Sequence, residues 1–412
     1  MKAALISIGN ELLNGRTVNS NATFIGGKLF EIGVRVREIF TIRDEPESIT
    51  NALTAALATN HIVLVTGGLG PTHDDITKKV IAGYFDSKLI FDESIVQRIE
   101  QKFRERGMRM PETNREQGFV PETATLIDNP VGTAPGLHFR QNGSHIFAMP
   151  GVPREMRAMV TDYILPLLSS EFQLKPTETR LFRTTRIPES GIYERCQHFL
   201  DEFSDLEIAF LPKFTGVDIR VTLPAIGDFS EKIAAFEQKL IQTIGKYIFT
   251  TEEDAMEATV GKLLKSQNLT LSVAESCTGG LIQQQITSVA GSSDYFSGGV
   301  VSYSNESKIK LLGVSPAALE KYGAVSEIVA QQMAEGIRQS LGTDFGISTT
   351  GIAGPGGGTA EKPVGLIFIG LATPDGTVVR QFNLGKDRHI NQQQTAIFAL
   401  DMLRRRLNGI PS

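Results

Sequence analysis

Several residue types that take part in hydrolytic chemistry follow an apolar run in the last third of the chain. Residues 269–274 have the composition of a buried strand, and the segment from residue 280 predicts a helix. The turn between them consists of Glu275, Ser276, Cys277, Thr278, Gly279 and Gly280. Such a sharp turn can present Ser276 or Cys277 as a nucleophile, and the N–H groups that begin the helix can stabilise an oxyanion. The alternatives are that Ser276 only caps the helix and that Cys277 is a small buried residue.

A serine nucleophile needs a base, and no histidine lies near Ser276 in the sequence. Lys308 can take this role if burial lowers its pKa to about 7–8. It follows Tyr303 and Asn305 at the end of a predicted strand, residues 299–303. Since ligands bind beyond the carboxyl ends of parallel strands, we expect these residues on the ligand side of the sheet, with Ser276. The alternative is that Lys308 is a solvated helix residue.

A glycine-rich loop follows a third predicted strand of this region, residues 345–349. Five glycines occur within the eight residues after Thr350, and Gly351, Gly354 and Gly356 are among them. Their backbone N–H groups can accept an anion, whereas a mobile turn is the alternative. The loop has neither the lysine of a Walker A motif nor the glycine spacing of a dinucleotide-binding fingerprint.

Arginines stand at both ends of the last predicted helix, residues 389–406. Arg388 precedes the helix and could hold a phosphate group through two parallel hydrogen bonds. The helix ends with Arg404, Arg405 and Arg406, which we expect to be solvated and to complement the helix dipole.

Glycines and carboxylates gather in a second place, at the ends of two strands predicted near the N-terminus. Glu11 follows the strand at residues 3–8, and the strand at residues 61–66 is followed by Gly67, Gly68, Gly70, Thr72, Asp74 and Asp75. The glycines let backbone N–H groups approach an anion beyond the strand ends. The two aspartates could hold a divalent cation that bridges to phosphate. A plain turn, with Asp75 as a helix cap, is the alternative.

The elements that must position these residues form three blocks, because 412 residues suggest two or three domains. Residues 1–170 alternate strands with helices, and this order predicts a parallel sheet covered on both faces. Residues 171–250 read as a small α+β unit. Residues 251–412 again alternate strands and helices. The expected fold class is therefore α/β, with a parallel-sheet N-terminal domain, a small α+β middle domain and a C-terminal α/β domain.

Composition narrows the range of functions. The net charge is −5 and the isoelectric point is about 5.8, so no whole-molecule basic field favours nucleic acid or anionic membranes. No apolar run reaches the roughly 18 residues that a transmembrane helix requires. Cys196 and Cys277 are the only cysteines and lie far apart. Neither a disulfide framework nor a zinc site is expected, and the cytoplasm fits best.

In combination, the motifs closely resemble the CinA (competence/damage-inducible) family over nearly the whole chain. The first block carries Gly9-x-Glu11-Leu-Leu, Thr66-Gly-Gly-Leu-Gly-Pro-Thr-x-Asp74-Asp75, Asn129-x-x-Gly-Thr-Ala-Pro-Gly and Met149-Pro-Gly-Val-Pro-x-Glu155. The last block carries Ala274-Glu-Ser-Cys-Thr-Gly-Gly280 and Thr350-Gly-x-Ala-Gly-Pro355.

For residues 1–170 the resemblance implies a molybdopterin-binding-like domain that hydrolyses ADP-ribose to AMP and ribose 5-phosphate. This activity would depend on a divalent cation such as Mg²⁺, Mn²⁺ or Co²⁺, held by Asp74 and Asp75. The rest of the site would comprise Glu11, Gly67, Gly68, Gly70, Thr72, Asn129, Gly132 and Thr133.

For residues 251–412 the resemblance implies deamidation of nicotinamide mononucleotide to nicotinate mononucleotide and ammonia, without a cofactor. Ser276 would be the nucleophile, Lys308 and Tyr303 its proton-transfer partners, and Thr350 would act with them at the substrate. The other substrate contacts would be Cys277, Thr278, Gly279, Gly280, Asn305, Gly351, Gly354, Gly356 and Arg388.

For residues 171–250 the resemblance implies a KH-like domain. A KH domain that binds nucleic acid uses a Gly-x-x-Gly loop, which this block lacks. The block contains ten Lys and Arg residues and twelve Asp and Glu residues, so its net charge is negative. We therefore expect a structural or dimerisation role, a homodimer, and neither nucleic acid nor membrane as a partner.

Two rival interpretations remain at this stage. In the first, only the C-terminal domain is active and the N-terminal domain is degenerate. In the second, the chain is a molybdopterin-carrying or partner-binding protein without turnover.

Overall fold

The computed structural model describes residues 1–72, 75–223 and 229–411. It divides into two compact units, Met1–Glu178 and Thr179–Ser412, which are treated separately below. In the part of the chain that is described, no helix combines the length and the apolar character needed to cross a bilayer.

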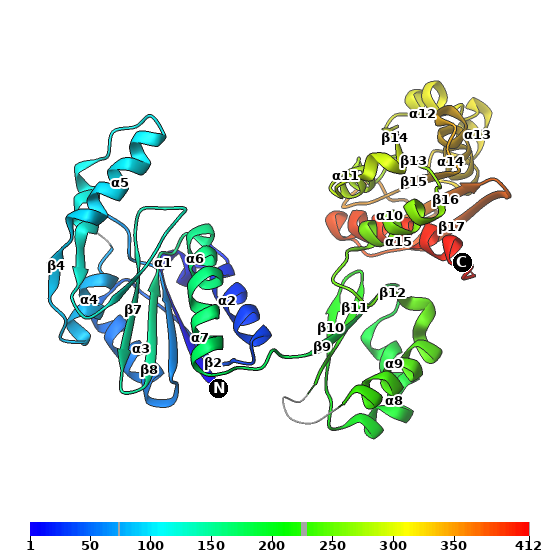
Figure 1. The fold of residues 1–412 in the computed structure, drawn as a ribbon. Helices are drawn as coiled ribbons and strands as arrows, with labels where there is room; N and C mark the ends of the chain where they lie inside the picture. Colours follow the sequence, from blue (N-terminus) through cyan, green and yellow to red (C-terminus); the bar gives the residue numbers. More distant parts are fainter. Residues whose placement is uncertain (73–74, 224–228, 412) are drawn as a thin grey trace. The chain divides into compact units, whose positions relative to one another are not determined.

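The first unit contains a six-stranded sheet in the order β2-β1-β3-β8-β7-β6 (Figure 1). Strands β2, β1, β3 and β8 are parallel, as the alternation of strands and helices predicts, and β7 and β6 extend the sheet in the antiparallel sense. A separate two-stranded sheet pairs β4 with β5. The strands are β1 Lys2–Ile8, β2 Arg35–Ile42, β3 Ile62–Thr66, β4 Leu89–Phe91, β5 Phe119–Pro121, β6 Thr125–Ile127, β7 Gly136–Gln141 and β8 Ser144–Met149.

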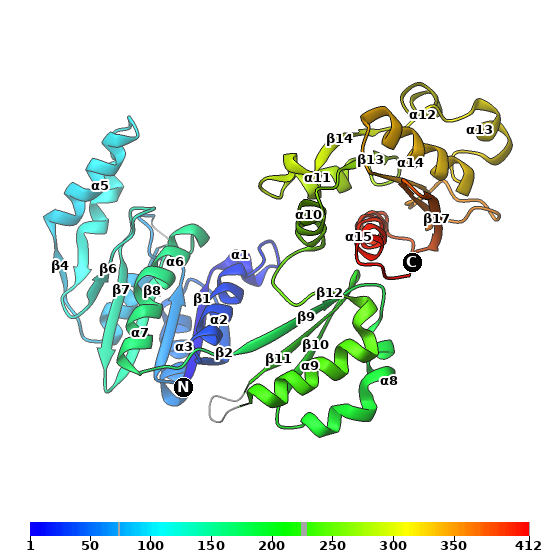
Figure 2. The same cartoon turned by 45° about the vertical axis from the view of Figure 1, so that its right-hand side comes forward.

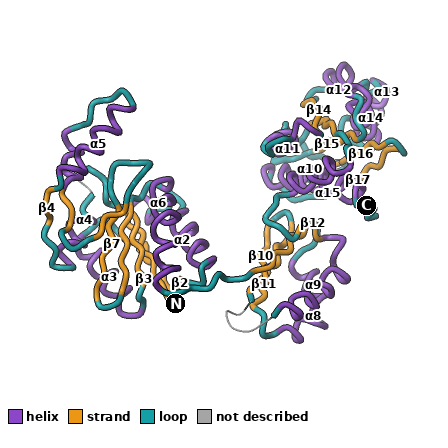
Figure 3. The backbone as a smooth tube through the Cα atoms, in the orientation of Figure 1, coloured by secondary structure: helices purple, strands orange, loops and turns teal. Residues whose placement is uncertain are grey.

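Helices cover both faces of this sheet, so that a separate core lies on each face (Figure 3). One core packs α2, α6 and α7 against the sheet, and the other packs α3 and α4. Because successive residues of a strand point to opposite faces, Leu5 belongs to the first core and Ile6 to the second. The helices are α1 Asn10–Leu13, α2 Ser20–Glu31, α3 Pro46–Thr59, α4 Thr77–Tyr84, α5 Glu93–Glu105, α6 Pro153–Met159 and α7 Leu165–Glu171, with turns of other helix types at η1 Glu112–Gly118 and η2 Val160–Ile164.

The second unit begins with a four-stranded antiparallel sheet in the order β10-β11-β9-β12. Figure 2 shows α8 and α9 on one face of this sheet, where they enclose a core of aliphatic and phenylalanine side chains. The elements are β9 Thr179–Thr184, α8 Glu189–Leu200, η3 Asp201–Phe203, β10 Glu207–Lys213, β11 Gly216–Thr222, α9 Ser230–Ile244, η4 Gly245–Tyr247 and β12 Ile248–Thr250.

We expect this small domain to bind neither single-stranded DNA nor RNA above the weak non-specific level at physiological salt. Several of its cations are already engaged by its own carboxylates, since Lys213 lies 2.6 Å from Asp218 and Lys232 lies 2.5 Å from Asp205. A gel-shift titration with short oligonucleotides checks the expectation. A salt-resistant, submicromolar complex would contradict it.

The rest of the second unit is a five-stranded sheet in the order β14-β13-β15-β16-β17. Strands β14, β13 and β15 are parallel, and β16 and β17 are antiparallel to their neighbours. Helices α10, α11 and α15 cover one face, and α12, α13 and α14 cover the other (Figure 1). The elements are α10 Met256–Gln267, β13 Leu271–Glu275, α11 Leu281–Thr287, η5 Ser292–Asp294, β14 Phe296–Val301, α12 Asn305–Leu312, α13 Pro316–Tyr322, α14 Glu327–Leu341, β15 Phe345–Gly351, β16 Leu366–Thr373, β17 Gly376–Asn383 and α15 Arg388–Leu407.

The arginines at the end of α15 do not form a solvated helix end, and that prediction is wrong for two of the three. Arg404 and Arg405 are 2% and 5% exposed, whereas Arg406 is exposed. Both buried guanidinium groups donate to the fully buried carboxylate of Asp401, at 2.9 and 2.8 Å, and to the backbone carbonyl of Lys246. They therefore hold the last turns of α15 against the turn that precedes β12.

Candidate functional site

Ser276 and Lys308, which are 32 residues apart, meet at the carboxyl end of β13. The Nζ atom of Lys308 lies 3.0 Å from Ser276 Oγ and donates to the backbone carbonyl of Ser302 at 2.6 Å. Ser276 is partly exposed at the turn after β13, and Lys308 reaches it from the first turns of α12. A side-chain amine on a serine hydroxyl is the arrangement that a lysine-activated nucleophile requires.

Lys308 is 1% exposed, so it is not a solvated helix residue. Burial disfavours the charged form and lowers the pKa of its ammonium group from the ordinary value of lysine. The capping box of Ser304 and Ser307 fixes the start of α12 one turn earlier and so aims the lysine inward. The predicted strand at residues 299–303 ends earlier than expected, since β14 stops at Val301.

Cys277, the rival nucleophile, belongs to the hydrophobic core on the other side of the strand end. Its side chain is 6% exposed and packs within the core beneath α11 and α15. Burial raises the pKa of the thiol to about 12, so the thiolate is scarce at neutral pH. Its carbonyl oxygen accepts a hydrogen bond from Gln392 of α15 at 3.0 Å, which fixes the turn beside Ser276.

Glu275 occupies the start of α11, a role that the sequence analysis did not assign. Its carboxylate is fully buried and accepts from the backbone N–H groups of Gly280, Ile282 and Gln283 at 2.9, 3.2 and 2.9 Å. These N–H groups are therefore not available to an oxyanion, which corrects that part of the sequence-based expectation. Among the described residues, the backbone N–H groups of Cys277 and Thr278 donate to no other residue.

Tyr303 and Arg388 lie together at the rim of the site. Tyr303 is 66% exposed, and its hydroxyl oxygen accepts from Arg388 at 3.4 Å. The other Arg388 terminal nitrogen donates to the Gly354 carbonyl oxygen at 2.9 Å, so the arginine ties the glycine-rich loop to α15. No hydrogen bond joins the described side chain of Tyr303 to Ser276 or Lys308.

Thr350 lies on the face of the sheet that α12 and α14 cover, which is also the face from which Lys308 reaches Ser276. Its buried hydroxyl donates to the Ala324 carbonyl oxygen at 2.8 Å, on the α14 side of the sheet. The neighbouring Thr349 faces the other side, where its hydroxyl shares a hydrogen bond of 2.7 Å with Thr278. The Thr349 carbonyl oxygen also accepts from the backbone N–H of Ser276 at 3.0 Å. Backbone alternation thus places Thr350 on the face of Ser276 and Lys308, and Thr349 on the opposite face with Cys277 and Thr278.

The remaining predicted substrate contacts in this domain surround the same strand ends. Gly279 and Gly280 have φ values of +67° and +100°, which a residue with a Cβ adopts at a cost. Gly351 closes β15 against Ile367 of β16, and Asn305 and Gly356 are exposed. The structure therefore brings Ser276, Lys308, Thr350, Arg388 and Tyr303 to one end of the sheet, with the Thr350 hydroxyl already hydrogen-bonded to the Ala324 carbonyl.

A cavity of about 820 Å³ lies at the carboxyl ends of the parallel strands in the first unit. Glu11 follows β1, Asp44 follows β2, Gly67 follows β3 and Gly151 follows β8, and all four line this cavity. Its walls also include Gly68, Gly70, Asp75, Thr133 and Glu155. A crevice beyond the strand ends is where open α/β sheets bind their ligands.

The loop after β3 is shaped by its own residues. A Cβ on Gly67 would overlap the Ile8 carbonyl oxygen, so only glycine fits there at φ +111°. One carboxylate oxygen of Asp75 accepts from the Thr72 backbone N–H and hydroxyl at 2.8 and 2.5 Å. Asp75 does not cap the following helix, because α4 begins at Thr77 without a side-chain cap.

The predicted divalent cation requires oxygen ligands, which the strand-end cavity would have to supply. Asp74, one of the two expected ligands, lies outside the described residues. No three His, Cys, Asp or Glu side chains come together as a ligand group within residues 1–72, 75–223 and 229–411. Mg²⁺ is commonly held by only one or two carboxylates together with substrate phosphates, so the oxygen-rich walls of this cavity suit such an ion.

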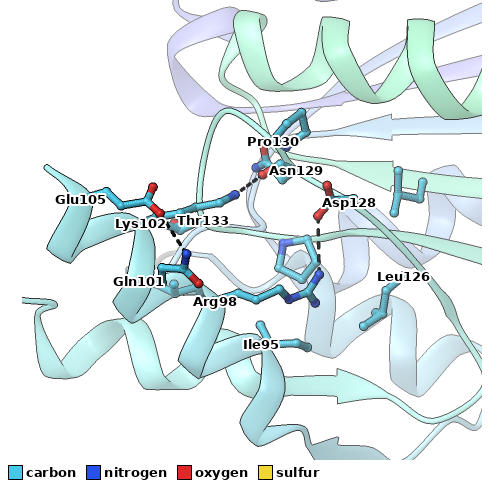
Figure 4. Close-up of a pocket in the computed structure, with 13 residues that line it drawn as sticks. Ile95, Arg98, Gln101, Lys102, Glu105, Leu126, Asp128, Asn129, Pro130 and Thr133 are labelled. Atoms are coloured by element: carbon cyan, nitrogen blue, oxygen red, sulfur yellow. Dashed lines mark hydrogen bonds and ion pairs between the residues drawn. The ribbon is translucent and has the colours of Figure 1, made fainter.

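Asn129 supports the wall of the cavity from inside the loop. Its amide nitrogen donates to Ala134 O and Glu155 Oε2 at 2.8 and 2.7 Å, and its amide oxygen accepts from the Gly132 N–H at 2.8 Å. Figure 4 shows Lys102 of α5 reaching the same loop, where it also donates to the Gly132 carbonyl oxygen at 2.9 Å. Asn129 is 3% exposed, so it orders the loop that presents Thr133.

Three family profiles match consecutive parts of this architecture. They are described as a probable molybdopterin binding domain, residues 4–170, a damage-inducible protein CinA KH domain, residues 179–250, and a CinA C-terminal domain, residues 253–407. A molybdopterin-binding-like domain, a KH-like domain and a CinA C-terminal domain thus define the class of this chain.

The chain belongs to the CinA family. It is 43% identical to a CinA-like protein of Chloroherpeton thalassium, over 99% of this chain and 100% of that protein. It is 39% identical to a putative competence-damage inducible protein of Caldicellulosiruptor saccharolyticus, over 98% and 99% of the two chains. A solved structure of CinA, of unknown function, from Thermoplasma acidophilum is 36% identical and covers 41% of this chain and 96% of its own, with a TM-score of 0.37.

Proposed function

We propose that the C-terminal domain is an amidohydrolase that converts nicotinamide mononucleotide to nicotinate mononucleotide and ammonia. One observation carries the proposal, namely that the fully buried amine of Lys308 lies 3.0 Å from the Ser276 hydroxyl. The choice of substrate rests on the family resemblance of the motifs around Ser276 and Thr350. A purified sample should release ammonia from nicotinamide mononucleotide, and unchanged substrate by mass spectrometry would refute the proposal.

The geometry suits a two-step reaction. Neutral Lys308 donates to the Ser302 carbonyl and keeps its lone pair for the Ser276 proton, so the serine oxygen can attack the carboxamide carbon. Collapse of the tetrahedral intermediate, with a proton from Lys308, expels ammonia and leaves an ester on Ser276. Water, deprotonated by Lys308, then attacks this ester and releases the carboxylate product and the free serine.

The developing oxyanion needs donors close to Ser276. We assign this role to the backbone N–H groups of Cys277 and Thr278, because Glu275 occupies those of the helix start. Arg388 stands at the rim with the glycine-rich loop and offers charge-assisted hydrogen bonds to the phosphate of the nucleotide.

The deamidation rate should rise with pH and level off above the pKa of Lys308. That pKa lies below the ordinary value of lysine because the amine is buried, and only the neutral amine can accept the serine proton. The measurement is kcat/KM for deamidation as a function of pH. A rate that falls as pH rises through this range would show that the protonated lysine is the active form.

We further propose that the N-terminal domain hydrolyses ADP-ribose to AMP and ribose 5-phosphate with a divalent cation. The strand-end cavity supports this proposal, since glycine N–H groups suit phosphate oxygens and the carboxylates suit a hard cation. Asp75, together with Asp74, would hold the ion, which when bound neutralises the charge of the pyrophosphate.

The residues of the chain would perform the remaining tasks in this cavity. The backbone around Gly67, Gly68 and Gly70 would bind the pyrophosphate, and Thr72 would keep one Asp75 oxygen in place. Glu11 and Glu155, which both line the cavity, would be the carboxylates that orient an attacking water, and Asn129 fixes one oxygen of Glu155.

A pterin-binding domain without turnover is the second candidate for residues 4–170, because the matching profile is described as a probable molybdopterin binding domain. Incubation with ADP-ribose and a divalent cation separates the two. Formation of AMP and ribose 5-phosphate supports hydrolysis, whereas intact ADP-ribose together with retention of a pterin phosphate supports binding alone.

A further inference from the structure

A second hollow, the α5 groove, adjoins the strand-end cavity at Thr133, and Figure 4 shows the residues that line this groove. We define it by Ile95, Arg98, Ile99, Leu126, Pro130 and Pro135. Its volume is about 420 Å³, within the range of sites that hold small ligands. Thr133 lines both hollows, so the loop that carries it is their common wall.

The two hollows differ in chemistry. The strand-end cavity is walled largely by carboxylates and glycines, which suit phosphates and a cation. The α5 groove has an apolar floor of Ile95, Ile99, Leu126 and Pro130, and its edge is charged or polar, with Arg98, Lys102, Glu105 and Asp128. Such a floor suits a flat heteroaromatic ring, and the exposed side chain of Gln101 stands beside it, where its amide nitrogen donates to Glu105 at 2.9 Å.

The common wall carries a positive charge. Lys102 Nζ donates to the backbone carbonyl oxygens of Asn129 and Gly132, which flank the turn before Thr133. Among the described residues, no carboxylate lies within ion-pair distance of Lys102. An ammonium that is paired only with carbonyl groups favours an anion nearby, so a phosphate at the junction of the two hollows is stabilised.

Arg98 adds a surface that can turn towards a ligand. Its guanidinium group pairs with Asp128 at 3.5 Å, and the two side chains are 54% and 74% exposed. An ion pair with this exposure contributes little, so the guanidinium plane can leave it at small cost. A guanidinium stacked on a nucleobase is a common means of binding bases without sequence contacts.

We propose that the α5 groove is the nucleobase subsite for a nucleoside diphosphate whose phosphates occupy the strand-end cavity. The inference rests on the proposed hydrolysis of ADP-ribose and deepens it, because it assigns the adenine end to α5 and leaves the reacting pyrophosphate beside Asp75. The domain would then select a nucleoside-bearing pyrophosphate over a sugar phosphate that lacks a base.

Filling the groove tests this assignment. Gln101→Trp places a large ring at the groove, and Gln97→Trp makes the same change one turn earlier, at an exposed position that does not line it. The probes are AMP and ribose 5-phosphate, titrated by calorimetry into the full-length protein. We expect Gln101→Trp to weaken AMP about tenfold or more, the size of a lost base-stacking contact, and Gln97→Trp to leave it unchanged. Ribose 5-phosphate should bind both variants equally.

The outcomes separate this inference from the proposed activity. Equal AMP affinity in the two tryptophan variants, or no AMP binding by the unmodified protein, overturns the subsite. If ADP-ribose is not cleaved and yet AMP binding is lost only in Gln101→Trp, the subsite stands and the proposed hydrolysis fails. Arg98→Ala is a second variant whose exposed side chain is dispensable for folding, and it should weaken AMP but not ribose 5-phosphate.

Discussion

Ser276→Ala should lower the rate of nicotinamide mononucleotide deamidation by about 10⁴-fold or more, as the loss of a nucleophile does when catalytic groups act as a unit. The substitution removes one partly exposed oxygen and leaves the core contacts of the turn unchanged. The fold should therefore survive, which circular dichroism and the cleavage of ADP-ribose by the other domain can verify. Ammonia release gives the deamidation rate.

Replacement of Lys308 should lower the deamidation rate nearly as much as Ser276→Ala does. Lys308→Met is preferable to alanine, because the side chain is 1% exposed and methionine fills the space without an amine. The double variant Ser276→Ala/Lys308→Met should be about as slow as either single variant, since both groups serve one proton transfer. Additive losses would show that the two residues act independently.

Cys277→Ala is the matched control for both variants. A thiolate would be the more reactive nucleophile, but the thiol is buried in the core and its pKa is raised to about 12. We expect deamidation by this variant to stay within about tenfold of the unmodified protein, because only packing is lost. A folded but inactive Cys277→Ala, beside an active Ser276→Ala, would exchange the roles of the two residues.

Chelation of divalent cations should abolish ADP-ribose cleavage and leave deamidation unchanged. The carboxylates and glycines of the N-terminal cavity suit a cation and phosphates, whereas the proton transfer proposed between Ser276 and Lys308 involves no metal. Both activities are measured on one sample before and after chelation, and after Mg²⁺ is returned.

Asp75→Asn provides the matched variant for this prediction. It keeps an oxygen for the Thr72 hydrogen bonds and removes the negative charge that a cation requires. We expect it to reproduce the effect of chelation, with cleavage lost and deamidation intact. An equal loss of both activities, by either treatment, would refute the separation of the two sites.

The strands that position both sites were predictable because their apolar runs are bounded by glycine and polar residues. The strand predicted at residues 345–349 is the first part of β15, Phe345–Gly351, and the strand predicted at residues 61–66 is β3, Ile62–Thr66, which begins one residue later. The approach of Lys308 to Ser276 followed from strand order, since β14 and β13 are parallel neighbours and their carboxyl ends meet.

The surroundings of the nucleophile were harder to predict, because they depend on which face each side chain occupies. Thr350 lies on the face of Ser276, but its hydroxyl donates to the Ala324 carbonyl, whereas Thr349 on the opposite face shares a hydrogen bond with Thr278. Glu275 was overlooked although a carboxylate just before a helix is a recognisable signal, because negative charge is stabilised at a helix N-terminus.

Polar contacts between elements that are distant in the sequence could not be predicted from the sequence. Asp44 lines the strand-end cavity from the end of β2, and no glycine-rich motif marks it. Asp401 lies three and four residues before Arg404 and Arg405 in the same helix, so this partner was visible in the sequence, whereas the Lys246 carbonyl reaches them only through folding. Such residues become identifiable only when the partner element is known.

Both ends of helix α15 are bound to other segments of the same unit, so its length sets the distance between these contacts. Its first residue, Arg388, binds the Gly354 carbonyl beside the candidate site, and Arg404 and Arg405 in its last turns bind the Lys246 carbonyl. Its 20 residues span about 30 Å, and each added or deleted residue would rotate one end about 100° against the other. A change in the length of this helix would therefore misalign Arg388 with the glycine-rich loop, or Arg404 and Arg405 with the Lys246 carbonyl.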